Sequence, residues 1–154
     1  MEKIRLLLVD DQKLFVQNLK IVLESRMRDA KVVGVAYDGR EALRLVKSED
    51  PEIVLMDVRM PVMDGVEATR EILTACPEMR IVMLTTFDDD EYVHSAMQYG
   101  AVGYLLKSMP PEELFTAIRA VHGGSVLVAP SVMKKVVSSG FHPAMYWPCP
   151  PVTA

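Results

Sequence analysis

Residues 4–11 read Ile-Arg-Leu-Leu-Leu-Val-Asp-Asp, a short and almost continuously apolar run that is followed at once by two aspartates. Such a run is typical of a strand that is buried on both faces. The chain contains four further runs of this kind, at Lys31–Ala36, Ile53–Met56, Ile81–Leu84 and Gly103–Leu106. Each is followed by a longer stretch with apolar residues three and four positions apart, as in an amphipathic helix. The alternation predicts repeated βα units, and therefore an α/β fold with a doubly wound, five-stranded parallel sheet.

Length and charge limit the classes of function. At 154 residues, with 50% of the composition apolar, the chain is long enough for one full core and short for two ordinary domains. A net charge of −4 argues against a nucleic-acid footprint, since phosphate binding needs clustered Lys and Arg. Two cysteines, no secretory leader and no apolar run of about 18 to 20 residues favour a cytoplasmic location without a membrane span.

We place the main domain at residues 1–124. The strand and helix pattern stops after Gly123 and Gly124, and residues 125–154 are predicted to be a linker and a proline-rich tail. Ser131–Ser138 has room for two helical turns, whereas the four prolines of residues 141–154 favour an extended or disordered end.

Polar side chains stand at the ends of four predicted strands. Asp10 and Asp11 follow the first strand, Asp57 ends the third, Thr85 ends the fourth and Lys107 follows the fifth. An open parallel sheet binds its ligands beyond the carboxyl ends of its strands, so we expect these side chains to converge. Three converging carboxylates repel one another unless a divalent cation lies among them, and hard oxygen ligands suit Mg²⁺. With Mg²⁺ bound, Asp57 has the chemistry of a nucleophile toward a phosphoryl donor, and Lys107 and Thr85 stabilise the transferred oxygens.

Several acidic residues have a simpler interpretation. Adjacent aspartates alone are most often turn or helix-cap residues, and only the other strand ends favour a site at Asp10. Asp88–Glu91 is best explained as the capped, acidic start of the fourth helix. Asp64 and Gly65 are predicted to form a turn before the third helix.

Four motifs resemble the receiver domains of response regulators in two-component signalling. They are Val9-Asp10-Asp11, Met56–Gly65 (Met-Asp-Val-Arg-Met-Pro-Val-Met-Asp-Gly), Leu84-Thr85-Thr86 and Gly100–Lys107 (Gly-Ala-Val-Gly-Tyr-Leu-Leu-Lys). The resemblance covers residues 3–124, with the four motifs in order at the predicted strand ends. It implies a flavodoxin-like sheet with the strand order 2-1-3-4-5.

The resemblance also implies the chemistry of the site. Asp57 is the implied phosphoacceptor, and the implied Mg²⁺ ligands are Asp11, Asp57 and the backbone carbonyl of Arg59. Asp10 would act largely through metal-bound water.

The same resemblance implies how phosphorylation is read out. Lys107 would pair with the phosphoryl group, and Thr85 would bind a phosphoryl oxygen and draw its loop inward. Tyr104 would be the aromatic switch that turns inward with Thr85. Arg59 and Phe87 lie two residues beyond the acceptor and the hydroxyl, and we expect them to set the lifetime of the phosphorylated state by obstructing the hydrolytic water.

Within the receivers, the motifs are similar to the NarL/FixJ class, in which a LuxR-type helix-turn-helix follows the receiver. We expect that output domain to be missing here, because residues 125–154 are too few to form it. The implied partners are a sensor histidine kinase and, after phosphorylation, a second copy of the chain. DNA contact, and with it transcription regulation, would come only through the missing domain. Ser108 stands where many receivers have a proline, which leaves the isomer of the Lys107–Ser108 peptide open.

Two other functions fit part of the pattern. A phosphatase of the aspartyl-phosphate kind also uses a strand-end aspartate and Mg²⁺, but it usually has a second aspartate two positions after the nucleophile, where this chain has Arg59. A receiver that binds partners without phosphorylation is the other alternative, and failure to bind a phosphoryl analogue with Mg²⁺ would favour it.

Overall fold

The carboxyl ends of the parallel strands all lie on one edge of a central sheet. In the computed structural model, which describes residues 2–86, 90–124 and 127–128, the strands run in the order β2-β1-β3-β4-β5-β6. Their bounds are β1 Ile4–Val9, β2 Ala30–Ala36, β3 Ile53–Met56, β4 Arg80–Thr85, β5 Gly103–Leu106 and β6 Leu127–Val128. Every pair is parallel. The predicted five-stranded order 2-1-3-4-5 is confirmed, and β6 extends it beyond β5.

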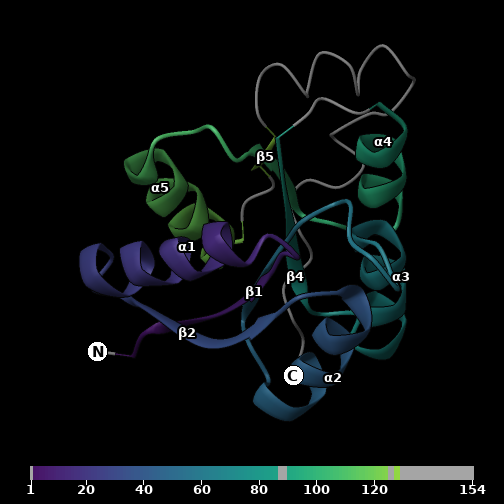
Figure 1. The fold of residues 1–154 in the computed structure, drawn as a ribbon, viewed down its shortest axis with the longest axis horizontal. Coiled ribbons are helices and arrows are strands. Elements are labelled where there is room, and N and C mark those ends of the chain that lie inside the picture. The colour runs from purple at the N-terminus through teal and green to yellow at the C-terminus, as the bar shows by residue number, and fades with distance from the viewer. Residues whose placement is uncertain (1, 87–89, 125–126, 129–154) are drawn as a thin grey trace.

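Helices cover both faces of this sheet. α1 (Lys13–Arg26) and α5 (Pro111–His122) pack on one face, and α2 (Gly39–Glu49), α3 (Gly65–Ala75) and α4 (Asp90–Gln98) pack on the other, as Figure 1 shows. Parallel strands need such crossover helices, because a strand that runs in the same direction as its neighbour cannot be reached by a tight turn.

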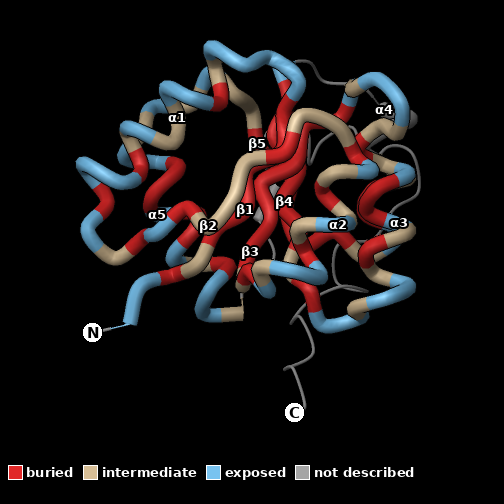
Figure 2. The backbone as a smooth tube through the Cα atoms, turned by 60° about the horizontal axis from the view of Figure 1, so that its bottom comes forward, coloured by how far each residue is buried: buried red, intermediate tan, exposed pale blue. Residues whose placement is uncertain are grey.

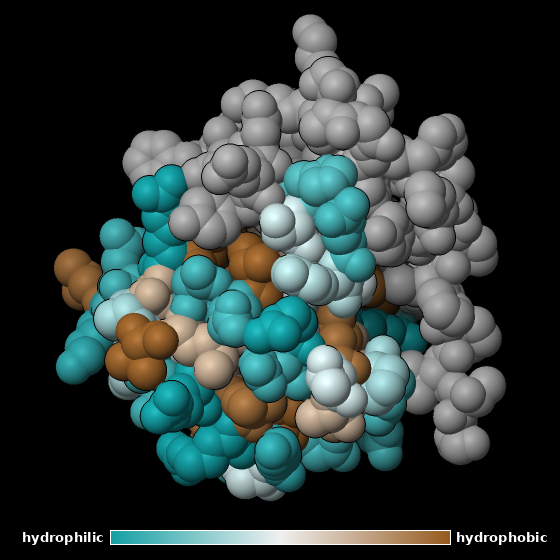
Figure 3. Space-filling view, turned by 90° about the vertical axis from the view of Figure 1, so that its right-hand side faces the viewer, coloured by the Kyte–Doolittle hydropathy of each residue, from teal (hydrophilic) through white to brown (hydrophobic). Residues whose placement is uncertain are grey.

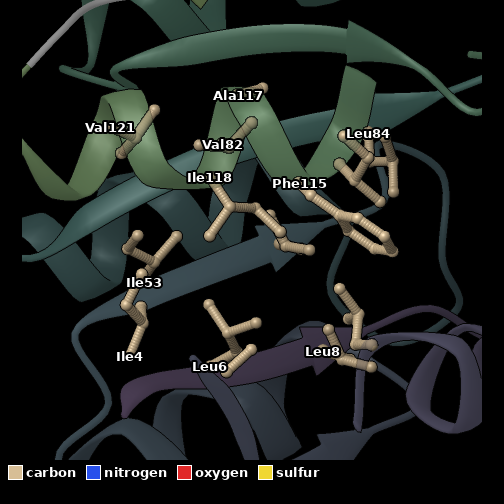
Figure 4. Close-up of a cluster of buried hydrophobic side chains, with 14 of the residues drawn as sticks. Ile4, Leu6, Leu8, Ile53, Val82, Leu84, Phe115, Ala117, Ile118 and Val121 are labelled. Carbon is tan, nitrogen blue, oxygen red and sulfur yellow. The ribbon is translucent and has the colours of Figure 1, made fainter. Parts of the chain in front are cut away.

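The strands are apolar along their whole length because each contributes to two cores. In β1, Leu6 and Leu8 belong to the cluster under α1 and α5, whereas Leu7 and Val9 belong to the cluster under α2, α3 and α4. Successive side chains of a strand point to opposite faces, which explains the absence of a polar alternation. Figure 2 shows the buried strands between partly exposed helices, and Figure 4 shows Phe115 and Ile118 of α5 facing Leu6 and Leu8 of β1.

Two aspartates start helices on the second face. The Asp38 carboxylate accepts a hydrogen bond from the Glu41 N–H at 2.9 Å at the start of α2, and Asp64 accepts one from the Glu67 N–H at 2.8 Å at the start of α3. These bonds satisfy backbone donors that have no partner within the helix. The predicted turn at Asp64 is therefore a helix cap, while residues 88 and 89 of the predicted cap of α4 lie outside the described residues.

β6 has no counterpart among the strands predicted from the sequence. Leu127 and Val128 pair with Gly103 and Tyr104 of β5, directly after the chain has crossed back along α5. Two residues are too few for a recognisable apolar run, and the pairing follows from the unpaired backbone groups of an edge strand. The predicted helical turns at Ser131–Ser138 and the predicted tail lie outside the described residues.

The outer surface has the mixed composition of a solvent-facing layer. Figure 3 shows hydrophobic side chains scattered among hydrophilic ones on the side of the molecule that carries α3 and α4. Among the described residues, no helix is long and apolar enough to cross a membrane.

Candidate functional site

Strand register brings the predicted site residues together. Val9 pairs with Met56, so Asp10 and Asp57 follow two neighbouring strands at the same level. The backbone N–H of Asp57 donates to the Val9 carbonyl at 2.9 Å, and that of Lys107 donates to the Thr85 carbonyl at 2.7 Å. These backbone bonds fix the positions from which the Asp57 and Lys107 side chains extend into the site.

Three aspartates form a carboxylate cluster at this edge. One ligand oxygen from each of Asp10, Asp11 and Asp57 lies within 4.8 Å of the other two. Asp10 and Asp57 are buried, with exposures of 3% and 8%, and Asp11 is exposed on the solvent side. Oxygen donors of this kind, open to water on one side, fit a hard divalent cation such as Mg²⁺.

The Lys107 ammonium lies among these carboxylates. Its Nζ is 2.6 Å from Asp10 Oδ2 and 3.4 Å from Asp57 Oδ1, and its side chain is only 6% exposed. A buried lysine loses the solvation of its charge, so it needs anionic or hydrogen-bonding neighbours. Lys107 therefore offsets part of the repulsion between the two buried aspartates.

Two further residues beside Lys107 were not predicted from the sequence. The Lys107 Nζ donates to Gln12 Oε1 at 3.2 Å, and it lies 4.6 Å from the centre of the Phe15 ring. The backbone N–H of Gln12 also donates to Asp10 Oδ1 at 2.8 Å. The sequence signal is that Gln12 directly follows the aspartate pair and Phe15 lies three residues further on, and this position alone does not indicate which side chains reach Lys107.

Burial dominates the electrostatics of Asp57. It raises the pKa of the Asp57 carboxyl from 3.8 to about 6, and the neighbouring Asp10 carboxylate acts in the same direction. The Lys107 ammonium and the Val58 N–H, which donates to Asp57 Oδ1 at 2.9 Å, lower this pKa. The charged carboxylate is therefore disfavoured in the metal-free protein.

This pKa predicts how metal-free stability depends on pH. Between about pH 4 and 6 the folded protein binds the Asp57 proton more tightly than the unfolded chain, so the free energy of unfolding falls as pH rises through this window. We expect Asp57→Asn to remove this decrease and to raise the free energy of unfolding at neutral pH, without Mg²⁺, by about 1–2 kcal/mol after allowance for solvent screening.

Urea unfolding across this pH window, with a chelator present, measures the effect. Asp64→Asn is the control, because asparagine caps a helix as well as aspartate does, and we expect a change within about 0.5 kcal/mol. A loss of stability at neutral pH in Asp57→Asn would contradict the prediction.

The remaining predicted site residues occupy different positions. Thr85 ends β4 and is 6% exposed, and Tyr104 in β5 is fully buried within the core under α2, α3 and α4. Arg59 lies two residues beyond Asp57, and its side chain is exposed. Phe87 lies outside the described residues, so its role in obstructing the hydrolytic water stays a prediction from the sequence.

The loop after Asp57 holds a residue in an unfavourable backbone conformation. Val62 has a φ of +70° and is 74% exposed. A β-branched residue is disfavoured in this left-handed region, whereas asparagine adopts it readily. We expect Val62→Asn to raise the free energy of unfolding by about 1 kcal/mol in urea titrations, and an unchanged value would contradict this explanation.

The fold and the site define a class of protein. It is a doubly wound α/β domain whose strand-end edge carries an aspartate cluster, a hydroxyl and a buried lysine. The chain belongs to the response regulator receiver domain family, whose model matches residues 6–119.

Curated relatives are transcriptional regulators. The chain is 43% identical over 140 residues to the uncharacterised transcriptional regulatory protein YxjL of Bacillus subtilis (strain 168), covering 91% of this chain and 64% of that protein. It is 39% identical over 135 residues to LiaR of the same organism, covering 88% of this chain and 64% of that protein. The chain thus spans slightly less than two thirds of the length of these relatives.

Solved structures place the chain in the same class. A LuxR-family two-component response regulator from Aurantimonas sp. SI85-9A1 is 33% identical with a TM-score of 0.82, covering 90% of this chain and 98% of that chain. The receiver domain of the NarL regulator from Mycobacterium tuberculosis is 33% identical with a TM-score of 0.76, covering 80% of this chain and 99% of that chain. The resemblance to the NarL/FixJ class is therefore confirmed.

Proposed function

We propose that this receiver domain is a phosphorylation-dependent switch that accepts a phosphoryl group on Asp57 from a sensor histidine kinase. One observation carries the proposal. A buried aspartate lies within reach of a buried lysine and of two further carboxylates, at the edge of the sheet where ligands bind. This arrangement joins a nucleophile to groups that balance the charge of a phosphoryl group.

The proposed metal ligands are Asp11, Asp57 and the backbone carbonyl of Arg59, with Asp10 acting through water. Bound Mg²⁺ would neutralise the carboxylates and the phosphoryl oxygens. A bound cation would favour the ionised, nucleophilic form of Asp57, as Lys107 does, against the burial and the Asp10 carboxylate that raise its pKa to about 6.

The phosphoryl transfer requires little covalent chemistry from the protein beyond the attack by Asp57. A carboxylate oxygen of Asp57 forms a bond to phosphorus as the bond from phosphorus to the donor's imidazole nitrogen breaks, and that nitrogen keeps the electron pair. Lys107 shifts from the carboxylates toward a phosphoryl oxygen and balances its charge. Positioning and electrostatic stabilisation account for the rate of such transfers.

The proposed output is a change of surface. Thr85 binds a phosphoryl oxygen and its loop moves inward, and Tyr104 keeps the buried position that it has in this structure. The surface formed by α4, β5 and α5 then favours a second copy of the chain. In a longer parent protein with an output domain after residue 124, dimerisation would regulate transcription in the cytoplasm, with DNA bound by that domain rather than by residues 1–124.

Arg59 is proposed to set the lifetime of this state. Its exposed side chain begins two residues beyond the acceptor, where it can obstruct the hydrolytic water, and Phe87, two residues beyond Thr85 in the sequence, is proposed to act in the same way. We expect Arg59→Ala to shorten the half-life of the phosphorylated domain in single-turnover hydrolysis. An arginine here also disfavours the phosphatase alternative, which needs a general acid at this position.

Beryllofluoride, a phosphoryl analogue, tests the proposal. We expect it to bind the wild type only when Mg²⁺ is present and to increase the dimer fraction in sedimentation velocity. We expect Asp57→Asn to bind both beryllofluoride and Mg²⁺ more weakly than the wild type does. If the wild type fails to bind beryllofluoride at saturating Mg²⁺, the domain is an interaction module that acts without phosphorylation.

A further inference from the structure

The Lys107 ammonium has two kinds of neighbour. Its charged neighbours are Asp10 and Asp57, and its uncharged neighbours are the Gln12 amide oxygen at 3.2 Å and the Phe15 ring at 4.6 Å. An ammonium group has three donor hydrogens, so one acceptor on each of Asp10, Asp57 and Gln12 accounts for all three. The aromatic face supplies a further attraction for the cation.

These two kinds of neighbour differ in what metal binding does to them. Asp10 and Asp57 belong to the carboxylate cluster, so a divalent cation there competes with Lys107 for their oxygens. Gln12 and Phe15 carry no charge, and they contact Lys107 from the start of α1 rather than from within the cluster. Neither contact with the ammonium uses a carboxylate oxygen that a metal in the cluster would bind.

The position of Gln12 supports a dedicated role. It is the N-cap residue of α1, where Ser, Thr, Asp or Asn would satisfy a backbone donor of the helix, yet its side chain makes no capping bond. The side chain instead reaches Lys107, and the Gln12 backbone N–H is tied to Asp10 Oδ1 at 2.8 Å. The start of α1 therefore has no side-chain cap, and the Gln12 side-chain amide is directed to Lys107 instead.

Phe15 supports Lys107 from the apolar side. It lines a pocket between α1 and α5 together with Leu19, Leu106 and Leu114, and Lys107 lies at the same pocket. The ring packs against the core under α1 and α5, which limits its movement. The Lys107 ammonium therefore contacts an aromatic ring whose movement is restricted by packing.

We propose that Gln12, backed by Phe15, is a positioning residue that keeps the Lys107 ammonium directed at Asp57 after Mg²⁺ has engaged the carboxylates. This inference rests on the proposed function and adds a residue to it. Loss of one hydrogen bond between the exposed Gln12 amide and a charged group predicts beryllofluoride affinity about 3- to 10-fold weaker in Gln12→Met. The affinity for Mg²⁺ alone should stay within about two-fold, because Gln12 contributes no carboxylate.

The experiment measures beryllofluoride affinity by fluorine NMR at saturating Mg²⁺, and Mg²⁺ affinity by calorimetry, in the full chain. Gln17→Met is the matched control, since the Gln17 amide bonds the Tyr37 hydroxyl at 2.7 Å and not Lys107. Gln12→Ser is the second variant, because serine restores a helix cap while losing the contact with Lys107. We expect it to unfold at the same or higher urea concentration and still to bind beryllofluoride more weakly.

A double-mutant cycle separates positioning from a general structural effect. In a Lys107→Ala background, Gln12→Met should cause no further loss of affinity. Equal binding by wild type and both Gln12 variants would overturn the inference while leaving the switch intact, and so would a loss that persists without Lys107. Failure of the wild type itself to bind would overturn the switch and the inference together.

Discussion

Replacing Gly65 by alanine is expected to lower the free energy of unfolding by about 3 kcal/mol, and to disturb the acceptor site as well. A Cβ at this position would lie 1.9 Å from the backbone carbonyl oxygen of Asp57, far inside any real contact distance. The backbone cannot easily yield, because the Gly65 N–H donates to the Val58 carbonyl at 2.7 Å and the residue opens α3. The start of α3 and the residue that follows β3 must therefore separate.

Urea unfolding of Gly65→Ala against Gly123→Ala measures this effect. Gly123 has a φ of −81°, and a Cβ there would meet its nearest neighbour at 3.4 Å, so we expect its substitution to change stability by at most about 0.5 kcal/mol. If both variants unfold at the wild-type urea concentration, the close approach of Gly65 to Asp57 is not a feature of the protein.

Replacing Lys107 by alanine is expected to slow phosphorylation by acetyl phosphate about 10²- to 10³-fold. The buried ammonium lies 3.4 Å from the acceptor carboxylate, in a site where few water molecules can replace its charge. Without it, the developing charge on the phosphoryl oxygens loses its only buried cationic partner among the described residues within reach of Asp57. The rate of mass increase under single-turnover conditions measures this loss.

Lys13→Ala provides the matched control for lost positive charge. Lys13 lies 5.3 Å from the Tyr37 ring at the start of α1, so its removal changes the net charge by the same amount without touching Asp57. We expect its rate to stay within about three-fold of the wild type, since exposed charges are screened. Similar rates for both lysine variants would mean that Lys107 acts only through the general field of the domain.

Much of the fold follows from the sequence because the strands are buried on both faces. The apolar runs predicted β1, β3 and β5 with their observed bounds, β2 to within one residue at its start, and β4 to within one residue at each end. The strand-end rule for parallel sheets then placed Asp10, Asp57 and Lys107 together, since a run of apolar residues that stops at an aspartate also marks where the strand stops.

Other features depend on contacts that no local pattern records. The link from Gln12 to Lys107 joins residues 95 positions apart, and it exists only once α1 and β5 are packed. The resemblance implies that Tyr104 is a switch, but the residues around it do not indicate its burial, which the packing of the core decides. β6 forms because β5 leaves an edge to be covered, and its two residues carry too little pattern to predict.

Intact mass after incubation with acetyl phosphate and Mg²⁺, with the wild type compared with Asp57→Asn, tests whether Asp57 is the phosphoacceptor. We predict a gain of about 80 Da, one phosphoryl group, in the wild type alone, and its loss when a chelator replaces Mg²⁺. No gain in the wild type, or an equal gain in Asp57→Asn, would contradict the assignment of Asp57 as the phosphoacceptor.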